Sequence, residues 1–129
     1  MTEIQAYKMD GLGNDFIIID RRKDKIKLSK EQIINIADRK KGTGCDQLIV
    51  MDKDNEKKTN AKITFYNSDG SETAACGNGS RCVSYFLMNE KKLIKSKINT
   101  ESGILKAKLT GKVEVSVDMG IPNFDWKKI

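Results

Sequence analysis

A change of hydrophobic period in the middle of the chain limits the possible folds most strongly. Apolar and polar residues alternate over residues 61–65, which predicts a half-buried strand. A polar segment punctuated by glycines follows over residues 67–82, and apolar residues at helical spacing come next, over residues 83–87. The sequence therefore predicts a strand, a loop and a helix in succession, with Cys76 at the turn into the helix.

Cys76 lies directly before the expected start of that helix, near residues 77–79. The first amide groups of a helix lack intrahelical partners, and the positive end of the helix dipole stabilises a thiolate beside them. The same amides can hold a carboxylate, and Gly77 and Gly79 let the backbone approach a ligand closely. A cysteine base beside a carboxylate site indicates chemistry at the α-carbon of an acid.

The other cysteines have a different setting. Cys82 falls inside the expected helix and Cys45 follows a glycine-rich turn, so we expect both to be packing residues, as most free cysteines are. A redox pair of Cys76 and Cys82 is the alternative. With three cysteines and no disulfide-scaffold pattern, the chain is typical of a reducing compartment.

Three motifs resemble, in the same order, those of the diaminopimelate epimerase family. The first is MDGLGNDF at residues 9–16. The second combines ADR at residues 37–39 with GTGCDQ at residues 42–47. The third combines NSDGSE at residues 67–72 with CGNGSRC at residues 76–82. The resemblance runs over essentially the whole chain, which has about half of the family's usual length.

The resemblance implies an isomerase that interconverts LL- and meso-diaminopimelate in lysine and peptidoglycan biosynthesis, with no cofactor. Such enzymes invert the α-carbon with a base on one face and an acid on the other, one cysteine from each of two similar domains. Cys76 would be the first catalytic cysteine. The substrate-binding residues that the resemblance implies are Asn14, Gln47, Asn67, Gly77 and Asn78.

Without the resemblance, two of these residues have simpler interpretations. Asn14 lies in a glycine-containing turn, where asparagine is common for conformational reasons alone. Gln47 is a polar residue at the start of an apolar segment, and such residues often only satisfy the end of a strand.

Other hydrophobic patterns predict short strands and a second helix. The helix is expected over residues 30–40, after a capping box of Ser29 and Gln32, with Gly42 and Gly44 ending it. Residues 52–59 read as a polar hairpin connection, and residues 91–97 as a basic linker. Strands are expected over residues 4–9, 16–20, 47–51, 98–100, 103–109 and 112–118, the last two joined by a turn at residues 110–111.

Many short strands with one strongly apolar helix favour an α+β domain whose mainly antiparallel sheet wraps around that helix. The resemblance implies one copy of the two-domain diaminopimelate epimerase-like fold. We expect residues 1–118 to form the N-terminal epimerase domain, which carries the first catalytic cysteine, and residues 119–129 to be an interdomain segment. The second domain would be absent, so the isolated chain is expected to be inactive.

Charge and composition exclude several other classes of protein. Lys and Arg number 24 against 18 Asp and Glu, but the two signs are interspersed and no aromatic stripe accompanies them, which indicates a solvated surface and no nucleic-acid partner. No segment approaches the roughly 20 apolar residues of a membrane span. The N-terminus also lacks a signal-peptide apolar region, so we expect a cytoplasmic protein with no membrane partner.

The absence of histidine excludes a Ser-His-Asp triad within this chain and a histidine metal site. Because three thiols alone leave a zinc site short of ligands, we expect no metal.

Two alternatives to the epimerase remain. One is a related isomerase of the proline racemase or phenazine-biosynthesis type, which shares the general fold. The other is an inactive fragment or ligand-binding domain. The partners implied are the small-molecule substrate and, for the full-length protein, a second copy in a homodimer.

Overall fold

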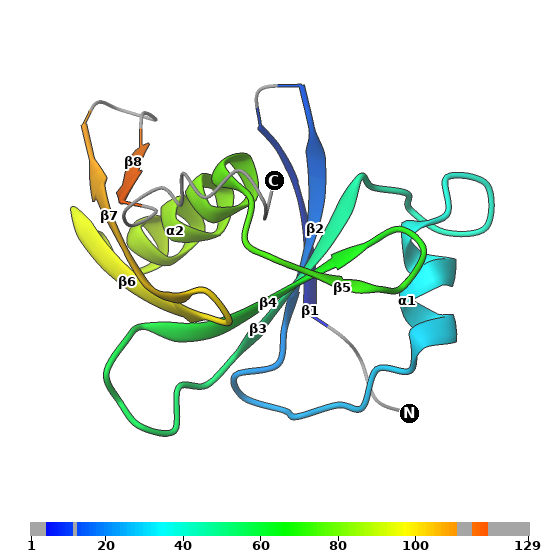
Figure 1. Cartoon of the computed structure of the whole chain (residues 1–129), viewed down its shortest axis with the longest axis horizontal. Coiled ribbons are helices and arrows are strands. Elements are labelled where there is room, and N and C mark those ends of the chain that lie inside the picture. The colour runs from blue at the N-terminus through cyan, green and yellow to red at the C-terminus, as the bar shows by residue number, and fades with distance from the viewer. Residues whose placement is uncertain (1–4, 12, 111–114, 119–129) are drawn as a thin grey trace, which may run out of the picture.

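The computed structural model describes residues 5–11, 13–110 and 115–118. The described residues form one mixed sheet of eight strands with two helices (Figure 1). In chain order the elements are β1 (Gln5–Asp10), β2 (Asp15–Asp20), α1 (Lys30–Ala37), β3 (Gln47–Asp52), β4 (Ala61–Asn67), β5 (Glu72–Thr73), α2 (Gly77–Lys91), β6 (Lys95–Thr100), β7 (Gly103–Leu109) and β8 (Val115–Asp118).

The strands follow the order β1-β2-β3-β4-β6-β7-β8, and β5 pairs with β4 beside this path. Most neighbouring strands are antiparallel, but β2 with β3 and β4 with β6 are parallel. Parallel neighbours need a long crossover connection, and each of these crossovers contains a helix, α1 in the first and α2 in the second. The predicted α+β class with a mainly antiparallel sheet is confirmed.

The central strands are buried on both faces. In β2, Phe16 and Ile18 join the core under α2, whereas Ile17 and Ile19 join the core under α1. Successive side chains of a strand point to opposite faces, so a continuous apolar segment can serve two cores at once. The sheet therefore separates two apolar layers, with one helix covering each.

The central helix α2 packs into the curl of the sheet (Figure 1). Its residues Val83 and Leu87 are buried as predicted, and each contributes roughly 1.5–3 kcal/mol through burial of its side chain. Phe86 is only half-buried, because it lies at the rim of this core, where its ring is 4.7 Å from the ring of Tyr7 on β1. The helical spacing also predicts that Phe86 is buried, and the structure buries it only in part.

The predicted capping box of α1 is present, but the helix ends at Ala37 and not at Lys40. Asp38 leaves the helical conformation, and its carboxylate accepts hydrogen bonds from the backbone N–H of Lys40 and Lys41 at 2.7 and 3.0 Å. This local turn competes with a further helical turn and ends the helix before Gly42 is reached.

The segment predicted as a basic linker is partly strand. β6 begins at Lys95, where exposed lysines at positions 95 and 97 alternate with the buried Ser96 and Ile98. The lysines mask an ordinary alternating pattern, because their chains extend into solvent from the open face of β6. The sequence predicts that the central helix ends near Asn89, but α2 runs to Lys91, and a left-handed Lys92 with a φ of 56° follows it.

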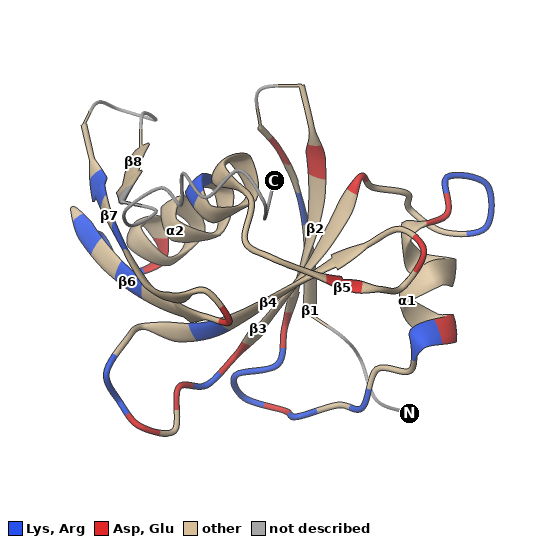
Figure 2. Ribbon diagram, in the orientation of Figure 1, with Lys and Arg blue, Asp and Glu red and all other residues tan. Residues whose placement is uncertain are grey.

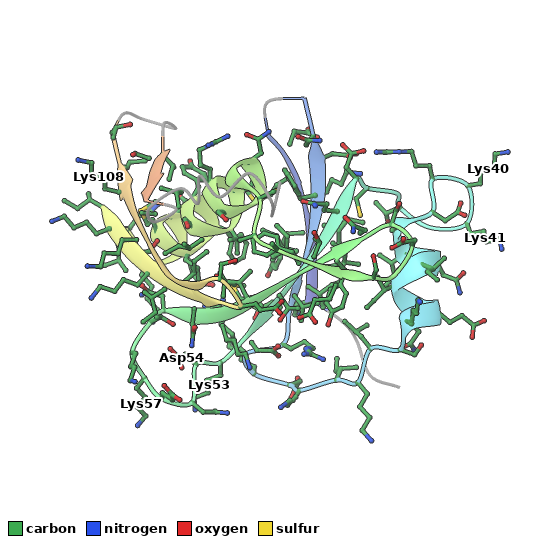
Figure 3. The ribbon with its side chains drawn as sticks, viewed as in Figure 1. Lys40, Lys41, Lys53, Asp54, Lys57 and Lys108 are labelled. Atoms are coloured by element: carbon green, nitrogen blue, oxygen red, sulfur yellow. The ribbon has the colours of Figure 1, made fainter. Side chains whose placement is uncertain are left out.

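Lys, Arg, Asp and Glu residues are distributed along the described chain, and both signs occur close together in several loops (Figure 2). The labelled lysines extend outward from the connection after α1, from the connection between β3 and β4, and from β7 (Figure 3). Asp54 is instead 6% exposed, and its carboxylate accepts hydrogen bonds from the backbone N–H of Glu56 and Thr59 at 3.1 and 2.9 Å. It thereby orders the hairpin connection predicted from the sequence.

Some predictions fall outside the described residues. These are the turn at Gly111, the first part of the last strand over residues 112–114, and the segment over residues 119–129. Among the described residues, no helix is long and apolar enough to cross a membrane.

Candidate active site

Cys76 is the N-cap residue of α2. Its backbone is extended, with φ −98° and ψ 152°, and its Sγ accepts a hydrogen bond from the backbone N–H of Gly79 at 3.1 Å. The carbonyl of Cys76 accepts the N–H of Ser80 at 2.9 Å, which closes the first helical turn. The half-buried thiol therefore lies at the amino end of the helix, the positive end of the helix dipole.

Gln47 approaches the same thiol from the sheet. The Cys76 thiol donates to Oε1 of Gln47 at 2.9 Å, across 29 positions of sequence. Gln47 is the first residue of β3, and its Cα partner on β4 is Asn67. The carboxamide of Asn67 donates to Oγ of Ser71 at 3.2 Å, so this side chain is engaged with the turn after β4. Strand register thus brings Asn67 beside Gln47. Of these two side chains, Gln47 is the one that makes a hydrogen bond with the Cys76 thiol.

A second pair of carboxamides joins the first loop to the start of α2. Nδ2 of Asn78 donates to Oδ1 of Asn14 at 3.0 Å. Oδ1 of Asn78 accepts a short hydrogen bond from the guanidinium of Arg81, one helical turn further along α2. Gly77 lies between Cys76 and Asn78, so all six residues predicted for the site fall around the start of α2 and the neighbouring strand ends.

Two glycines beside the candidate site pack closely against their neighbours. A Cβ atom at Gly79 would lie 2.9 Å from the Phe65 ring and 3.0 Å from Sγ of Cys76. A Cβ atom at Gly11 would lie 3.2 Å from the ring of Phe16 and 3.4 Å from Cβ of Asn78. These contacts let the helix start approach the sheet and the first loop, which keeps the thiol near Gln47.

Charged residues surround the starts of β2 and β3. Asp15 Oδ1 accepts the backbone N–H of Asp46 at 2.9 Å, and Asp46 Oδ2 accepts the backbone N–H of Asp15 at 3.1 Å. Arg39 binds both oxygens of Asp15, at 2.8 and 2.9 Å, and Lys8 lies 2.9 Å from the same carboxylate. The Arg39 guanidinium and then the Lys8 ammonium hold the pKa of the Asp15 carboxyl well below its usual range.

The other two cysteines lie in the cores. Cys45 is 2% exposed and Cys82 is 7% exposed. Burial raises the pKa of both thiols, because the charged thiolate loses its hydration, and Cys76 raises that of Cys82 further. Both are therefore packing residues, as the sequence predicted.

A second charged cluster lies at the far end of β2, beside a cavity of about 990 Å³. There Arg22 is bound by both oxygens of Asp20, at 2.9 and 3.0 Å, and by both oxygens of Glu90, at 2.7 and 2.9 Å. Its donors are used to join β2 to the end of α2, and no cysteine lines this cavity among the described residues. Within the described parts of the chain, no group of three or more His, Cys, Asp or Glu could hold a metal ion.

Sequence reasoning missed the charged residues that hold the site together. Asp15, Arg39, Asp46 and Arg81 all fall inside the motifs noted above, but nothing in the sequence assigned a role to them. Each makes its contact with a residue from another segment, or from the next turn of α2. The only sequence feature that could have pointed to these four residues is that they lie inside the family motifs.

Comparison with known proteins agrees with the motifs. The family model described as diaminopimelate epimerase matches residues 6–124. The diaminopimelate epimerase of Pelagibacter ubique is 48% identical over 127 residues, which covers 98% of this chain and 45% of that protein. The diaminopimelate epimerase of Phenylobacterium zucineum is 43% identical over 122 residues and is covered to 43%. The chain thus spans less than half the length of these relatives.

Solved structures share the fold at low sequence identity. A methylitaconate-delta-isomerase matches with a TM-score of 0.64 at 17% identity, over 87% of this chain and 62% of that protein. A phenazine biosynthesis protein of the PhzF family from Enterococcus faecalis matches with a TM-score of 0.63 at 14% identity, over 84% of this chain and 41% of that protein. With the family model matching most of its length, the chain belongs to the diaminopimelate epimerase family.

Proposed function

We propose that this chain supplies one half of the active site of an epimerase that interconverts LL- and meso-diaminopimelate. The observation that carries the proposal is the position of Cys76, with its thiol at the start of α2 between the Gly79 amide and Gln47. The relatives that match the chain carry the name diaminopimelate epimerase, which supports this substrate. The activity belongs to lysine and peptidoglycan biosynthesis in the cytoplasm.

Inversion of the α-carbon needs two groups, one on each face of the substrate. In one direction the Cys76 thiolate takes the α-proton, and a thiol on the opposite face donates a proton to the carbanion. In the other direction Cys76 is the donor and the opposing group is the base. Neither Cys45 nor Cys82 can be the opposing group, because both are buried in the cores. We assign that role to a cysteine outside this chain, in the second domain of the family's fold.

The start of α2 would stabilise the negative charge of the transition state. The helix start at Gly77 and Asn78, with its backbone amides and the positive end of the helix dipole, is suited to the α-carboxylate, which would then lie beside Cys76. The carboxamides of Asn14, Gln47 and Asn67 offer both donors and acceptors for the amino and carboxylate groups of the substrate. No step of this mechanism requires a cofactor.

Solvent exchange at the α-carbon tests the proposal. The chain is incubated in deuterium oxide with LL- or meso-diaminopimelate, beside a Cys76→Ala variant, and deuterium incorporation is followed by mass spectrometry. Incorporation that depends on Cys76 supports a working half-site. Epimerisation by the chain alone would contradict the assignment of the second base to another domain, and exchange that persists without Cys76 would contradict its role. The full-length protein is proposed to be a homodimer, which size measurements in solution check separately.

A further inference from the structure

The carboxamide of Asn14 is held at both ends. Its Oδ1 accepts from Nδ2 of Asn78 at 3.0 Å, and its Nδ2 donates to Oδ2 of Asp46 at 3.3 Å. Asp46 is itself held, because its Oδ1 accepts from Arg39 at 3.0 Å. These contacts join the first loop, the connection after α1 and the start of α2 in one chain of hydrogen bonds.

We propose that Asp46 is a positioning residue that sets the orientation of the Asn14 carboxamide for substrate binding, with Arg39 fixing Asp46. This inference rests on the substrate-binding role proposed above for Asn14. Nothing in the motifs assigns such a role to Asp46 or to Arg39.

The orientation follows from the chemistry of the two ends. An ionised carboxylate only accepts hydrogen bonds, so the end of Asn14 that faces Asp46 must be the NH₂ group. A guanidinium only donates, so the oxygen of Asn78 must face Arg81, which turns the NH₂ group of Asn78 toward Asn14. Asp46 beside Asn14 and Arg81 beside Asn78 therefore exclude the flipped orientation of either carboxamide.

Stability does not account for this arrangement. The side chains of Arg39 and Asp46 are 56% and 42% exposed, and exposed ion pairs contribute little to folding. Their geometry is nevertheless specific, because Arg39 reaches the Asp15 carboxylate with two donors and Asp46 with one of the same nitrogens. A planar guanidinium with several donors in a fixed fork suits such a role better than a lysine would.

Asp46 also aligns the strand ends that carry the site. Its backbone N–H donates to the carbonyl of Asp15 at 3.1 Å and to Oδ1 of Asp15 at 2.9 Å, so the starts of the parallel strands β2 and β3 are held in register. Asn14 precedes β2 directly and Gln47 follows Asp46 directly. One aspartate therefore places residues from both segments relative to Cys76.

The test measures the Asn14 side chain and ligand binding separately in this chain. The variants are Asp46→Ala and Asp46→Asn, and the matched control is Asp38→Ala, which removes the same charge from the same connection but contacts only the backbone of Lys40 and Lys41. Nuclear magnetic resonance of the ¹⁵N-labelled chain follows the Asn14 NH₂ signals. Titration with meso-diaminopimelate gives the dissociation constant.

In Asp46→Ala, the two Asn14 NH₂ protons are expected to move toward the chemical shifts of an unconstrained asparagine side chain and to exchange faster with water, and the dissociation constant is expected to rise about tenfold. Asp46→Asn keeps only one of the two accepting oxygens and places an NH₂ group where the other accepted, so an intermediate rise of about threefold is expected. Asp38→Ala is expected to change neither quantity. Protected backbone amides of Ile18 and Ile49 report that each variant is folded.

Other results would overturn the inference. Unchanged Asn14 signals in Asp46→Ala would exclude the positioning role, and so would a freed Asn14 side chain with unchanged affinity. Equal weakening in Asp46→Asn and Asp38→Ala would show a general charge effect. Should Asp46→Ala not fold, Arg39→Ala applies the same test, with a smaller loss of order at Asn14 expected.

The proposed function and the positioning role can fail independently. If the unaltered chain does not bind diaminopimelate while Asn14 loosens in Asp46→Ala, the substrate assignment fails and the positioning role stands. If the chain binds diaminopimelate while Asn14 does not respond, the positioning role fails and the proposed function stands.

Discussion

The two helices of this domain begin in similar geometry but with different chemistry. Ser29 and Cys76 are both N-caps with extended backbone, and each accepts the backbone N–H three residues later at 3.1 Å. At α1 the side chain of Gln32 also returns to the Ser29 N–H at 2.8 Å, and Glu31 adds a negative charge. At α2 the third helical residue is Gly79, which has no side chain to return, and the first turn has no acidic residue.

The difference indicates what each helix start is for. The capping box closes the start of α1 and stabilises it, as serine and glutamine do in many proteins. The start of α2 has a thiol in place of a strong capping residue and glycines in place of good helix formers. We relate this lower local stability to the proposed binding of a negatively charged group at the start of α2.

The largest expected effect is the difference in reactivity between the thiols. Iodoacetamide is expected to modify Cys76 at least about 100-fold faster than Cys45 or Cys82, because the latter are buried with a raised pKa and react through a thiolate that burial disfavours. Mass spectrometry of the alkylated peptides over time gives the three rates. Comparable alkylation rates at Cys76 and Cys82 would contradict the claim that the thiol at the start of α2 is reactive and the core thiol is not.

A substitution at Gly79 tests whether the start of α2 depends on close packing. Gly79→Ala is expected to lower the free energy of unfolding by about 2 kcal/mol, because the new Cβ would collide with the Phe65 ring and the Cys76 sulfur. The matched control is Gly77→Ala, whose Cβ would meet only Arg81 at 3.4 Å and should be tolerated. Urea unfolding measures both, and equal free energies for the two variants would contradict the packing argument.

The two caps can be compared directly. Ser29→Ala is expected to lower the free energy of unfolding by about 1 kcal/mol, because it removes the capping box, and to leave the reactivity of Cys76 unchanged. Cys76→Ser keeps a capping oxygen and is expected to change the free energy of unfolding by less than about 0.5 kcal/mol. A larger loss from Cys76→Ser than from Ser29→Ala would mean that the thiol has a mainly structural role. Urea unfolding of both variants provides the comparison.

A smaller loss of stability is expected from the charged network of Asp15, Arg39 and Asp46. This network lies at the starts of β2 and β3, next to the candidate site. Because the folded-state pKa of Asp15 lies below its unfolded value of about 4, the stability it contributes is complete above that pH and is lost as the pH falls further. Asp15→Asn is expected to lower the free energy of unfolding near neutral pH by less than about 1 kcal/mol.

Urea unfolding of both proteins from pH 7 downward measures this difference. The gap between the unaltered chain and Asp15→Asn should be constant near neutral pH and should narrow as the pH falls below about 4. If the difference in the free energy of unfolding became larger at low pH, the folded-state pKa of Asp15 would not be lowered.

Sequence patterns predicted most local features of the fold, but they misplaced the ends of two elements and did not indicate which strands pair. The Ser29 capping box and the helix start at Cys76 depend on neighbouring residues, and both are confirmed. The end of α1 was misplaced because the Asp38 turn competes with the helix, and the start of β6 was missed because lysines hide its alternation. The parallel pairings of the sheet leave no local signal.

The same limit applies to the candidate site. The sequence indicated Cys76 and, through a family resemblance, the residues that surround it. It did not indicate that Gln47 would accept a hydrogen bond from the Cys76 thiol or that Asp46 would accept one from Asn14, since these contacts join segments 29 and 32 positions apart. The roles of the site residues in substrate binding stay predictions.

The most direct measurement of the central claim is deuterium incorporation at the α-carbon of diaminopimelate, with the chain and its Cys76→Ser variant compared at equal concentration. Inversion needs the opposing group and is not expected from this chain alone, but exchange of the α-proton needs only one base, so we predict exchange in the unaltered chain. Serine preserves the cap but is a far weaker base than a thiolate, so we predict at least about a 100-fold loss of exchange in the variant. Exchange at the same rate in both proteins would contradict the claim that the start of α2 is kept open for the chemistry of Cys76.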